Sequence, residues 1–175
     1  MGLSNLIIQL IGFGGTAAYL LSFQFKKNRH LFMMQTASYC FYFTHYYLLG
    51  ALTGAFSYGV NLVRSILLSS RWKWAHTWYA CAFLCVMQVV MCALTWNGII
   101  SLLPCAANIA STIGGYSGNA RTIRSANMFV NSPLCAIYAI IVGSWAGHID
   151  ELLSEVSIII SIIRYGWKNL DEVQE

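Results

Sequence analysis

The sequence predicts an all-α polytopic membrane protein with seven transmembrane helices, and three observations lead to this class. Hydrophobic residues make up 58% of the chain and charged residues only 9%, against about 25% in soluble domains. With a mean hydropathy of +0.61, the chain cannot cover itself with a polar surface in water. Its apolar residues form long runs that rarely alternate with polar ones, which favours helices over the strands of a transmembrane barrel.

Seven apolar runs are separated by short connections. Each is close to the ~20 residues that a helix needs to cross a hydrocarbon core of ~30 Å. The first run has no basic residues ahead of it and no small-residue cleavage pattern after it, so we expect a mature helix and not a signal peptide. The expected helices cover residues 6–23, 31–49, 55–70, 75–95, 98–116, 129–145 and 149–164. We expect residues 1–175 to form a single transmembrane domain.

An internal repeat relates the first three of these helices to the last three. The matched positions keep their residue type at offsets that drift from 95 to 100: Ser22 and Ser117, Gln24 and Asn119, Arg29 and Arg124, Tyr42 and Tyr138, Gly50 and Gly147, and Arg64 and Arg164. The pattern predicts a first three-helix repeat at 1–70, a linker helix at 71–96, and a second repeat with a short tail at 97–175. Because one linker helix restores the orientation, the repeats are expected to be parallel and related by an axis along the membrane normal.

The basic residues give the orientation of the helices, because membrane insertion places Lys and Arg in cytoplasmic loops. All ten lie on one side of the predicted bundle, whereas the N-terminus and the connections 50–54, 96–97 and 147–151 on the other side contain none. We therefore expect an N-terminus outside and a C-terminus in the cytoplasm. The formal net charge of +4 follows from this orientation, so a nucleic-acid partner is not expected.

Several short motifs resemble those of the YgjV family of bacterial inner-membrane proteins. They are the run SFQFKKNR at 22–29, then Gln35, Ser38 and His45, the turn LGALTGA at 49–55, and Asn61 and Arg64. The resemblance covers nearly the whole chain and implies a bacterial inner-membrane location. More distantly, the three-one-three plan is similar to the SWEET, PQ-loop and PnuC group of small-solute facilitators. In that group a Pro-Gln pair often ends the first helix, and here Phe23 and Gln24 stand at these positions.

Chemistry at a metal or a catalytic centre is not expected. The six cysteines all fall inside predicted helices, and Cys81 and Cys85 have no second pair of ligands, so buried packing is favoured over metal binding. No Asp or Glu occurs before Asp150, which excludes a paired-carboxylate site from the first repeat. We therefore expect no enzyme activity, no metal and no cofactor.

Polar residues inside predicted membrane spans are costly, and they mark functional sites by default. Parallel repeats usually enclose a central path, so polar residues at mid-depth of equivalent helices are expected to face it. The candidate substrate-binding residues are Asn61, Asn108 and Ser161, with Tyr42 and Tyr138 as walls and Arg64 and Arg164 as the inner mouth. The arginines favour an anionic or hydrogen-bond-accepting solute, and the tyrosines suit a flat or ring-shaped one.

Two functions remain open at the level of sequence. The first is a small-solute transporter or facilitator that binds a small polar or aromatic solute between the repeats. The second is a non-transporting membrane scaffold or accessory subunit whose central bundle is packed shut, because a buried Asn can also simply bond a neighbouring helix. Polar groups that face one another at mid-membrane indicate the transporter. The lipid bilayer is the expected partner, and a homo-oligomer is left open.

Overall fold

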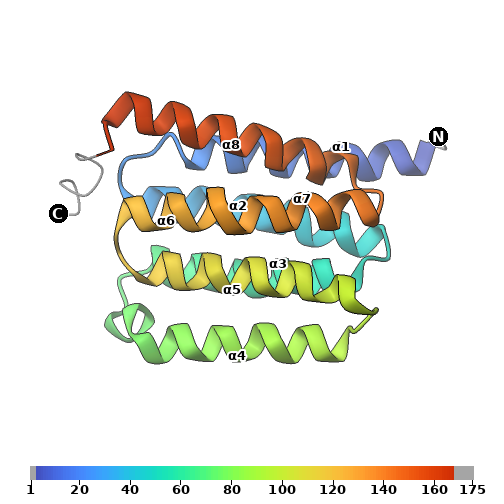
Figure 1. The fold of residues 1–175 in the computed structure, drawn as a ribbon, viewed down its shortest axis with the longest axis horizontal. Helices are drawn as coiled ribbons and strands as arrows, with labels where there is room; N and C mark the ends of the chain where they lie inside the picture. Colours follow the sequence, from blue (N-terminus) through green and yellow to red (C-terminus); the bar gives the residue numbers. More distant parts are fainter. Residues whose placement is uncertain (1–2, 168–175) are drawn as a thin grey trace.

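The computed structural model describes residues 3–167, and within them it contains helices and turns but no strand (Figure 1), as predicted. Six of its seven long helical stretches are single helices: α1 (Leu3–Ser22), α2 (Asn28–Leu48), α3 (Leu52–Ser69), α4 (Trp78–Leu94), α5 (Leu102–Tyr116) and α8 (Trp145–Tyr165). The remaining one joins α6 (Ala120–Ala126), the π-helical turn η3 (Asn127–Asn131) and α7 (Ser132–Ile141). Short 3₁₀ turns, η1 (Lys73–His76) and η2 (Ile99–Ser101), precede α4 and α5.

The helices are stacked in tiers: α1 with α8, then α2 with α6, η3 and α7, then α3 with α5, and α4 on its own (Figure 1). Within this stack α1 packs on α2 and α8, α2 packs on α3, and α3 and α5 pack on each other and on α4. The buried centre is rich in tyrosine, and the ring of Tyr58 stacks on those of Tyr42 and Tyr46 at centroid distances of 5.0 and 5.2 Å. Among the helix contacts described above, the one between α3 and α5 forms an interface inside the bundle.

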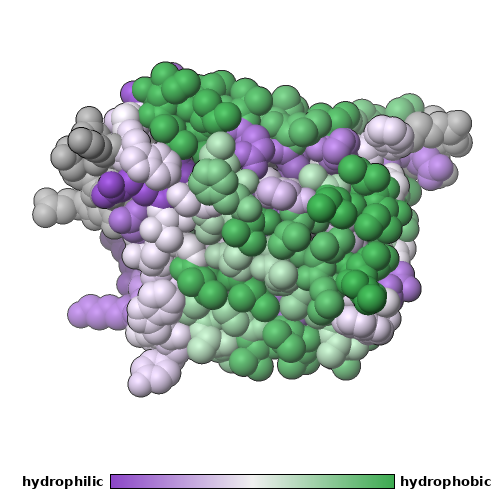
Figure 2. Space-filling view, viewed as in Figure 1, coloured by the Kyte–Doolittle hydropathy of each residue, from purple (hydrophilic) through white to green (hydrophobic). Residues whose placement is uncertain are grey.

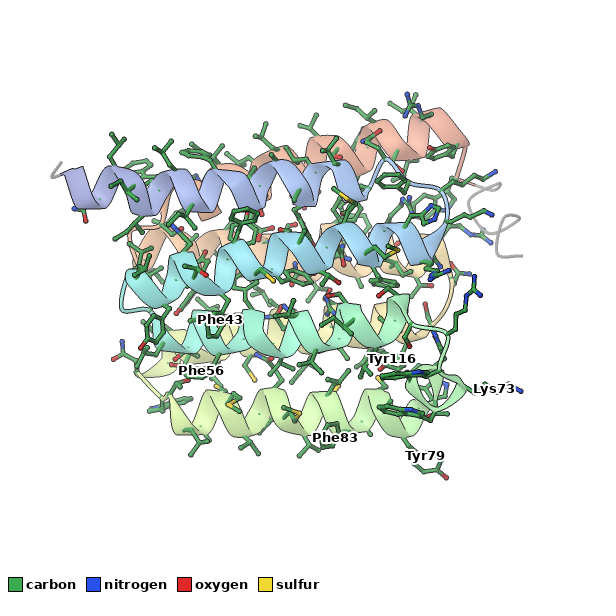
Figure 3. The ribbon with its side chains drawn as sticks, turned by 180° about the vertical axis from the view of Figure 1, so that it is seen from behind. Phe43, Phe56, Lys73, Tyr79, Phe83 and Tyr116 are labelled. Atoms are coloured by element: carbon green, nitrogen blue, oxygen red, sulfur yellow. The ribbon has the colours of Figure 1, made fainter. Side chains whose placement is uncertain are left out.

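The outer face of the bundle is strongly apolar. Tyr79 and Phe83 are exposed on the free side of α4 (Figure 3), and Figure 2 shows apolar residues across much of one face, with hydrophilic ones at its left end and in a strip along α8. By length and composition alone, two segments of the described chain, Asn5–Ser22 and Ile99–Tyr116, could cross a membrane. An extended apolar exterior of this kind indicates a surface that is not in contact with water.

Two turns with the same backbone geometry end α2 and α7. Gly50 (φ 74°) and Gly143 (φ 71°) adopt the left-handed conformation that glycine tolerates. The hydrogen bonds of the two turns follow the same pattern. The amide of the residue before the glycine donates to the carbonyl four residues earlier in the chain. The glycine amide donates to the carbonyl three residues earlier, and the amide of the next residue donates to the carbonyl five residues earlier. Gly143 is therefore the structural counterpart of Gly50, at an offset of 93, and the predicted match of Gly50 with Gly147 is wrong.

The last helix starts earlier than the sequence predicts. Ser144 caps it, because its Oγ accepts a hydrogen bond from the Gly147 amide at 3.0 Å. As a result α8 begins at Trp145 and not at residue 149. Residues 147–151, which were expected in a connection on the outer side, lie in the first two turns of this helix.

The sixth helical stretch begins at Ala120 and ends at Ile141, whereas residues 129–145 were predicted. Its first turn is capped by Asn119, whose Oδ1 accepts from the amides of Arg121 and Thr122 at 2.9 and 3.0 Å. Hydropathy misses this start because residues 120–127 carry several polar side chains between their apolar ones. The polar side chains on the inner face of these turns find partners inside the bundle.

The π-helical turn inserts one residue into this stretch relative to α2. Each buried position of α2 has a buried counterpart 92 residues later up to the first residue of η3 and 93 residues later from its last residue onward. Leu31, Phe32 and Gln35 correspond to Ile123, Arg124 and Asn127, and Ser38, Tyr39, Tyr42, His45 and Tyr46 correspond to Asn131, Ser132, Cys135, Tyr138 and Ala139. Likewise, each buried residue of α8 lies 93 residues after a buried residue of α3. The two hairpins thus bury the same faces although the residue types differ.

Candidate functional site

Polar side chains from six elements meet around a small cavity in the middle of the bundle, called here the central cavity. It is lined by Tyr19 of α1, Tyr39 and Tyr42 of α2, Tyr58 and Asn61 of α3, Asn108 of α5, Asn131 of η3, and Asp150 and Glu151 of α8. Its volume is about 10 Å³, which is room for about one water molecule. Buried polar groups are costly in so apolar a bundle, and their concentration makes this cavity the candidate site.

Asn61 and Asn108 face each other across the interface of α3 and α5. The Nδ2 of Asn61 donates to Oδ1 of Asn108, whose own Nδ2 donates to the Pro104 carbonyl at 2.7 Å. Asn61 is only 2% exposed, yet its Oδ1 has no hydrogen-bond partner among the described residues. The structure therefore brings these two predicted residues together and leaves one amide oxygen free at the cavity.

Two more polar pairs continue this contact along the two helices. One turn from Asn61, Arg64 donates from Nη1 to Oγ1 of Thr112 at 3.2 Å and from Nη2 to the Tyr39 hydroxyl at 2.9 Å. Toward the opposite end, the side-chain oxygens of Thr53 and Ser101 lie 3.3 Å apart. We call the three pairs, Arg64 with Thr112, Asn61 with Asn108 and Thr53 with Ser101, the α3–α5 seam. Their spacing places Thr53, Asn61 and Arg64 on one face of α3. It places Asn108 and Thr112 on one face of α5, in line with Ser101, the last residue of η2 before that helix.

A pocket lies at each end of the α3–α5 seam. The pocket near the basic loops has a volume of about 490 Å³ and is lined by Lys27, Asn28, Arg29, His30, Phe32, Leu68, Ser70, His76, Gly115 and Gly118. The other has a volume of about 310 Å³ and includes Thr53, Ser101 and Tyr138 in its lining. Leu68 and Gly115 follow the seam residues Arg64 and Thr112 by one helical turn. A Cβ at Gly115 would lie 3.0 Å from the Leu68 side chain, so the helices are in close contact where this pocket ends.

The two predicted wall tyrosines lie at different levels. Tyr42 lines the central cavity, and its hydroxyl lies 2.8 Å from Oγ1 of Thr16. Tyr138 instead lines the 310 Å³ pocket, where its hydroxyl accepts from the Gly54 amide at 3.0 Å. A Cβ at Gly54 would meet the Tyr138 ring at 2.8 Å, so the ring lies directly over the backbone of α3. Tyr138 thus covers one end of the seam rather than the central cavity.

Ser161 and Arg164 do not lie with the other predicted residues. The Oγ of Ser161 accepts from Nε of Arg124 at 3.1 Å, and Arg164 is exposed, with Nη1 3.4 Å from Oε1 of Gln24. The predicted pairing of Arg64 with Arg164 used an offset of 100, whereas the buried faces of α3 and α8 correspond at 93. Arg64 is buried and Arg164 is on the surface, so the two do not form a joint inner mouth.

The sequence reasoning missed two carboxylic side chains at the central cavity. Asp150 and Glu151 are 2% and 4% exposed, and they lie beside the hydroxyls of Tyr42 and Ser132, respectively. Oδ1 of Asp150 and Oε2 of Glu151 have no hydrogen-bond partner in the described part of the chain. Matching Gly147 to Gly50 had put both in an outer connection. The capping residue Ser144 is the signal that places them inside a helix.

A helical bundle with an apolar exterior and a polar centre has the architecture of an integral membrane protein. A family model described as "Bacterial inner membrane protein", Imp-YgjV, matches residues 6–169. The chain therefore belongs to this family of bacterial inner-membrane proteins, which confirms the resemblance to the YgjV family that the short motifs suggested. Comparisons with curated proteins and with solved structures found no match. The similarity to the SWEET, PQ-loop and PnuC group stays a prediction.

Proposed function

We propose that the protein is a small-solute transporter or facilitator of the bacterial inner membrane, with its binding site at the central cavity. In this proposal its seven helical stretches cross the bilayer, with the N-terminus outside and the C-terminus in the cytoplasm. The one-sided distribution of basic residues supports that orientation. The 490 Å³ pocket near the basic loops then faces the cytoplasm, and the 310 Å³ pocket faces the outside.

The α3–α5 seam carries this proposal. It aligns hydrogen-bonded polar pairs at three levels, with a pocket at each end. Small or apolar side chains would be sufficient for helix packing alone, and polar groups at membrane depth are costly. A line of such groups between two pockets is therefore the arrangement expected of a solute path. The free Oδ1 of Asn61 at its middle is an acceptor that a solute could use.

Parallel repeats related by an axis along the membrane normal form part of the proposal. The support is the recurrence of the buried positions of α2 and α3 at offsets of 92 and 93, together with the identical turns at Gly50 and Gly143. On this plan α4 is the linker helix, and the α3–α5 seam lies between the end of the first repeat and the start of the second. Solute sites of repeat-built transporters lie at such interfaces, near mid-membrane.

The side chains at the central cavity change the solute that is expected. Only Arg64 of the predicted arginine pair is near it, while Asn61, Asp150 and Glu151 each present an oxygen without a hydrogen-bond partner among the described residues. These acceptors favour a small polar solute that donates hydrogen bonds or carries positive charge over an anionic one. The tyrosine rings around the cavity also suit a flat, aromatic solute.

A non-transporting scaffold or accessory subunit is the second candidate, and the small size of the central cavity favours it. About 10 Å³ admits no metabolite, so a transporter must open from this occluded arrangement, whereas a scaffold would remain packed shut. The two candidates therefore differ in whether the seam opens, and a ligand that binds there would stabilise the transporter only.

Thermal unfolding of the purified protein with a panel of polar and aromatic metabolites tests the proposal. A ligand at 100 times its Kd adds ~2.7 kcal/mol, or roughly 5–10 °C in Tm for a protein of this size. Asn61→Leu should remove the response to the ligand while leaving the protein folded. The matched control is Gln88→Leu, which removes another buried amide, one that bonds Ser57 outside the seam at 2.5 Å, and should keep the response. A response that Asn61→Leu retains, or a panel without any response, would favour the scaffold.

A further inference from the structure

Two neighbouring carboxylic side chains in the middle of the bundle have no role in the α3–α5 seam. Asp150 and Glu151 come from α8, on the opposite side of the central cavity from that seam, and both are almost completely buried. A carboxylate at this depth is strongly destabilising unless a proton, a basic side chain or a bound cation neutralises it. The charge balance around the cavity therefore has to be accounted for.

Arg64, one helical turn from the cavity residue Asn61, does not neutralise them through a hydrogen bond. The terminal nitrogens of Arg64 bond to Thr112 and to the Tyr39 hydroxyl. One guanidinium against two carboxylates also leaves one negative charge. The titratable groups that line this region or lie beside a carboxyl group are Tyr19, Tyr39, Tyr42, Tyr58, Cys135 and the half-buried Glu155, and none of these can supply a positive charge. The buried imidazole of His45 on α2 bonds instead to the Ile8 carbonyl and to Oγ of Ser144, at 2.8 Å each. His148 lines a separate pocket beside Trp145.

The free atoms at the cavity are all oxygens. Asp150, Glu151 and Asn61 each contribute one oxygen without a hydrogen-bond partner in the described chain, and Asn61 does so independently from α3. Carboxylate and amide oxygens are the ligands that hard cations prefer. These three donors include no imidazole nitrogen or thiolate sulfur, so the set is better suited to a hard, singly charged cation than to a transition metal. A volume of about 10 Å³ fits one bare ion and no metabolite.

We propose that the central cavity binds one Na⁺ ion, held by the oxygens of Asp150, Glu151 and Asn61. One monovalent cation balances the charge that Arg64 leaves uncompensated and satisfies the three free oxygens together. Because the ligands come from α3 and α8, the bound ion joins the end of the first predicted repeat to the end of the second. Its role as a coupling ion rests on the proposed transport function, but its binding does not.

Thermal unfolding of the purified full-length protein in NaCl, KCl or choline chloride at constant ionic strength tests this site. At saturating Na⁺ the Tm of the wild-type protein should rise by roughly 5–10 °C over choline, with a smaller rise in KCl. Asp150→Asn and Glu151→Gln should abolish the Na⁺ response. Glu155→Gln, which alters a carboxyl one helical turn farther along α8, should keep it.

Radioactive ²²Na⁺ binding to the wild-type protein gives a readout that does not depend on the variants folding, and one ion per chain is expected. Absence of Na⁺ binding and of a Na⁺-specific shift would overturn the proposal, as would a response that Asp150→Asn and Glu151→Gln retain. Stability that follows pH but not Na⁺ would assign the neutralising role to protons and overturn it equally. Na⁺ binding without any response to metabolites would leave this site standing and count against transport only.

Discussion

Exchanging the side chains of Gly114 and Ala126 tests the packing of α5 against α6. The start of α6 is one that the hydropathy of the sequence does not reveal. A Cβ at Gly114 would meet the Ala126 Cβ at 2.7 Å and the Thr122 carbonyl at 3.4 Å. Neither neighbour is the end of a flexible side chain, so Gly114→Ala must push the helices apart, which costs ~1–3 kcal/mol. The better helix propensity of Ala offsets up to ~1 kcal/mol of this cost. We expect a net loss of about 1–2 kcal/mol, or roughly 2–8 °C in Tm.

The double variant makes this prediction specific. Ala126→Gly alone should cost about 1 kcal/mol through helix propensity, but together with Gly114→Ala it restores one methyl group to the contact and cancels the two propensity changes. Thermal and denaturant unfolding in detergent should therefore give a stabilising coupling of at least ~1 kcal/mol. Gly59→Ala is the matched control, because its Cβ would meet only Phe43 at 3.4 Å, and it should not destabilise. Additive effects of the two exchanged positions would refute the α5–α6 contact.

Two further predictions concern orientation and the Arg64 network. In a cysteine-free background, Asn97→Cys should react with an impermeant thiol reagent in intact cells and Arg71→Cys should not, because Lys and Arg mark the cytoplasmic side; the reverse labelling would invert the orientation. Tyr39→Phe removes the 2.9 Å bond from Arg64 and the 3.3 Å bond to Oε1 of Gln35, and it should lower the unfolding free energy by about 1.5–3 kcal/mol. Tyr116→Phe, which deletes a buried hydroxyl without a partner among the described residues (Figure 3), should change it by less than ~0.5 kcal/mol, and equal losses would contradict this assignment.

The helical fold could be predicted because long apolar runs indicate membrane-spanning helices directly. The starts of α6 and α8 could not be predicted in this way. In α6, Arg124 lowers the hydropathy of the first turns although its guanidinium is fully buried. There Nε donates to Ser161 at 3.1 Å and Nη1 to the Ala120 carbonyl at 3.2 Å. Hydropathy assigns one value to each residue type and contains no information about such partners. At α8 the glycine pair 143 and 147 offers two turn positions, and only the backbone conformation decides between them.

The residues of the candidate site could be predicted only in part, because the sequence does not show which residues of the two hairpins correspond. Asn61 and Asn108, each a single amide in the middle of an apolar helix, were expected to face the same space, and the structure places them in hydrogen-bond contact. The counterpart of Asn61 was predicted at Ser161, whereas the buried faces match it with Ser154. An error of seven residues is close to two helical turns, so Ser161 lies on the correct face but ~10 Å too far along α8. The one-residue insertion at η3 alters the offset between the hairpins and is invisible to a search for matching residue types.

Opening of the α3–α5 seam is tested most directly by the thiol accessibility of one cysteine placed at its middle. Asn108→Cys in a cysteine-free background would be exposed to an impermeant thiol reagent in right-side-out and in inside-out membrane vesicles. The proposed path predicts labelling from both sides, more slowly than at the exposed Asn97→Cys from the outside. Val89→Cys, on the outer surface of α4, should stay unlabelled in the bilayer. No labelling of Asn108→Cys from either side, with Asn97→Cys fully labelled, would contradict the transporter and leave a bundle that is packed shut.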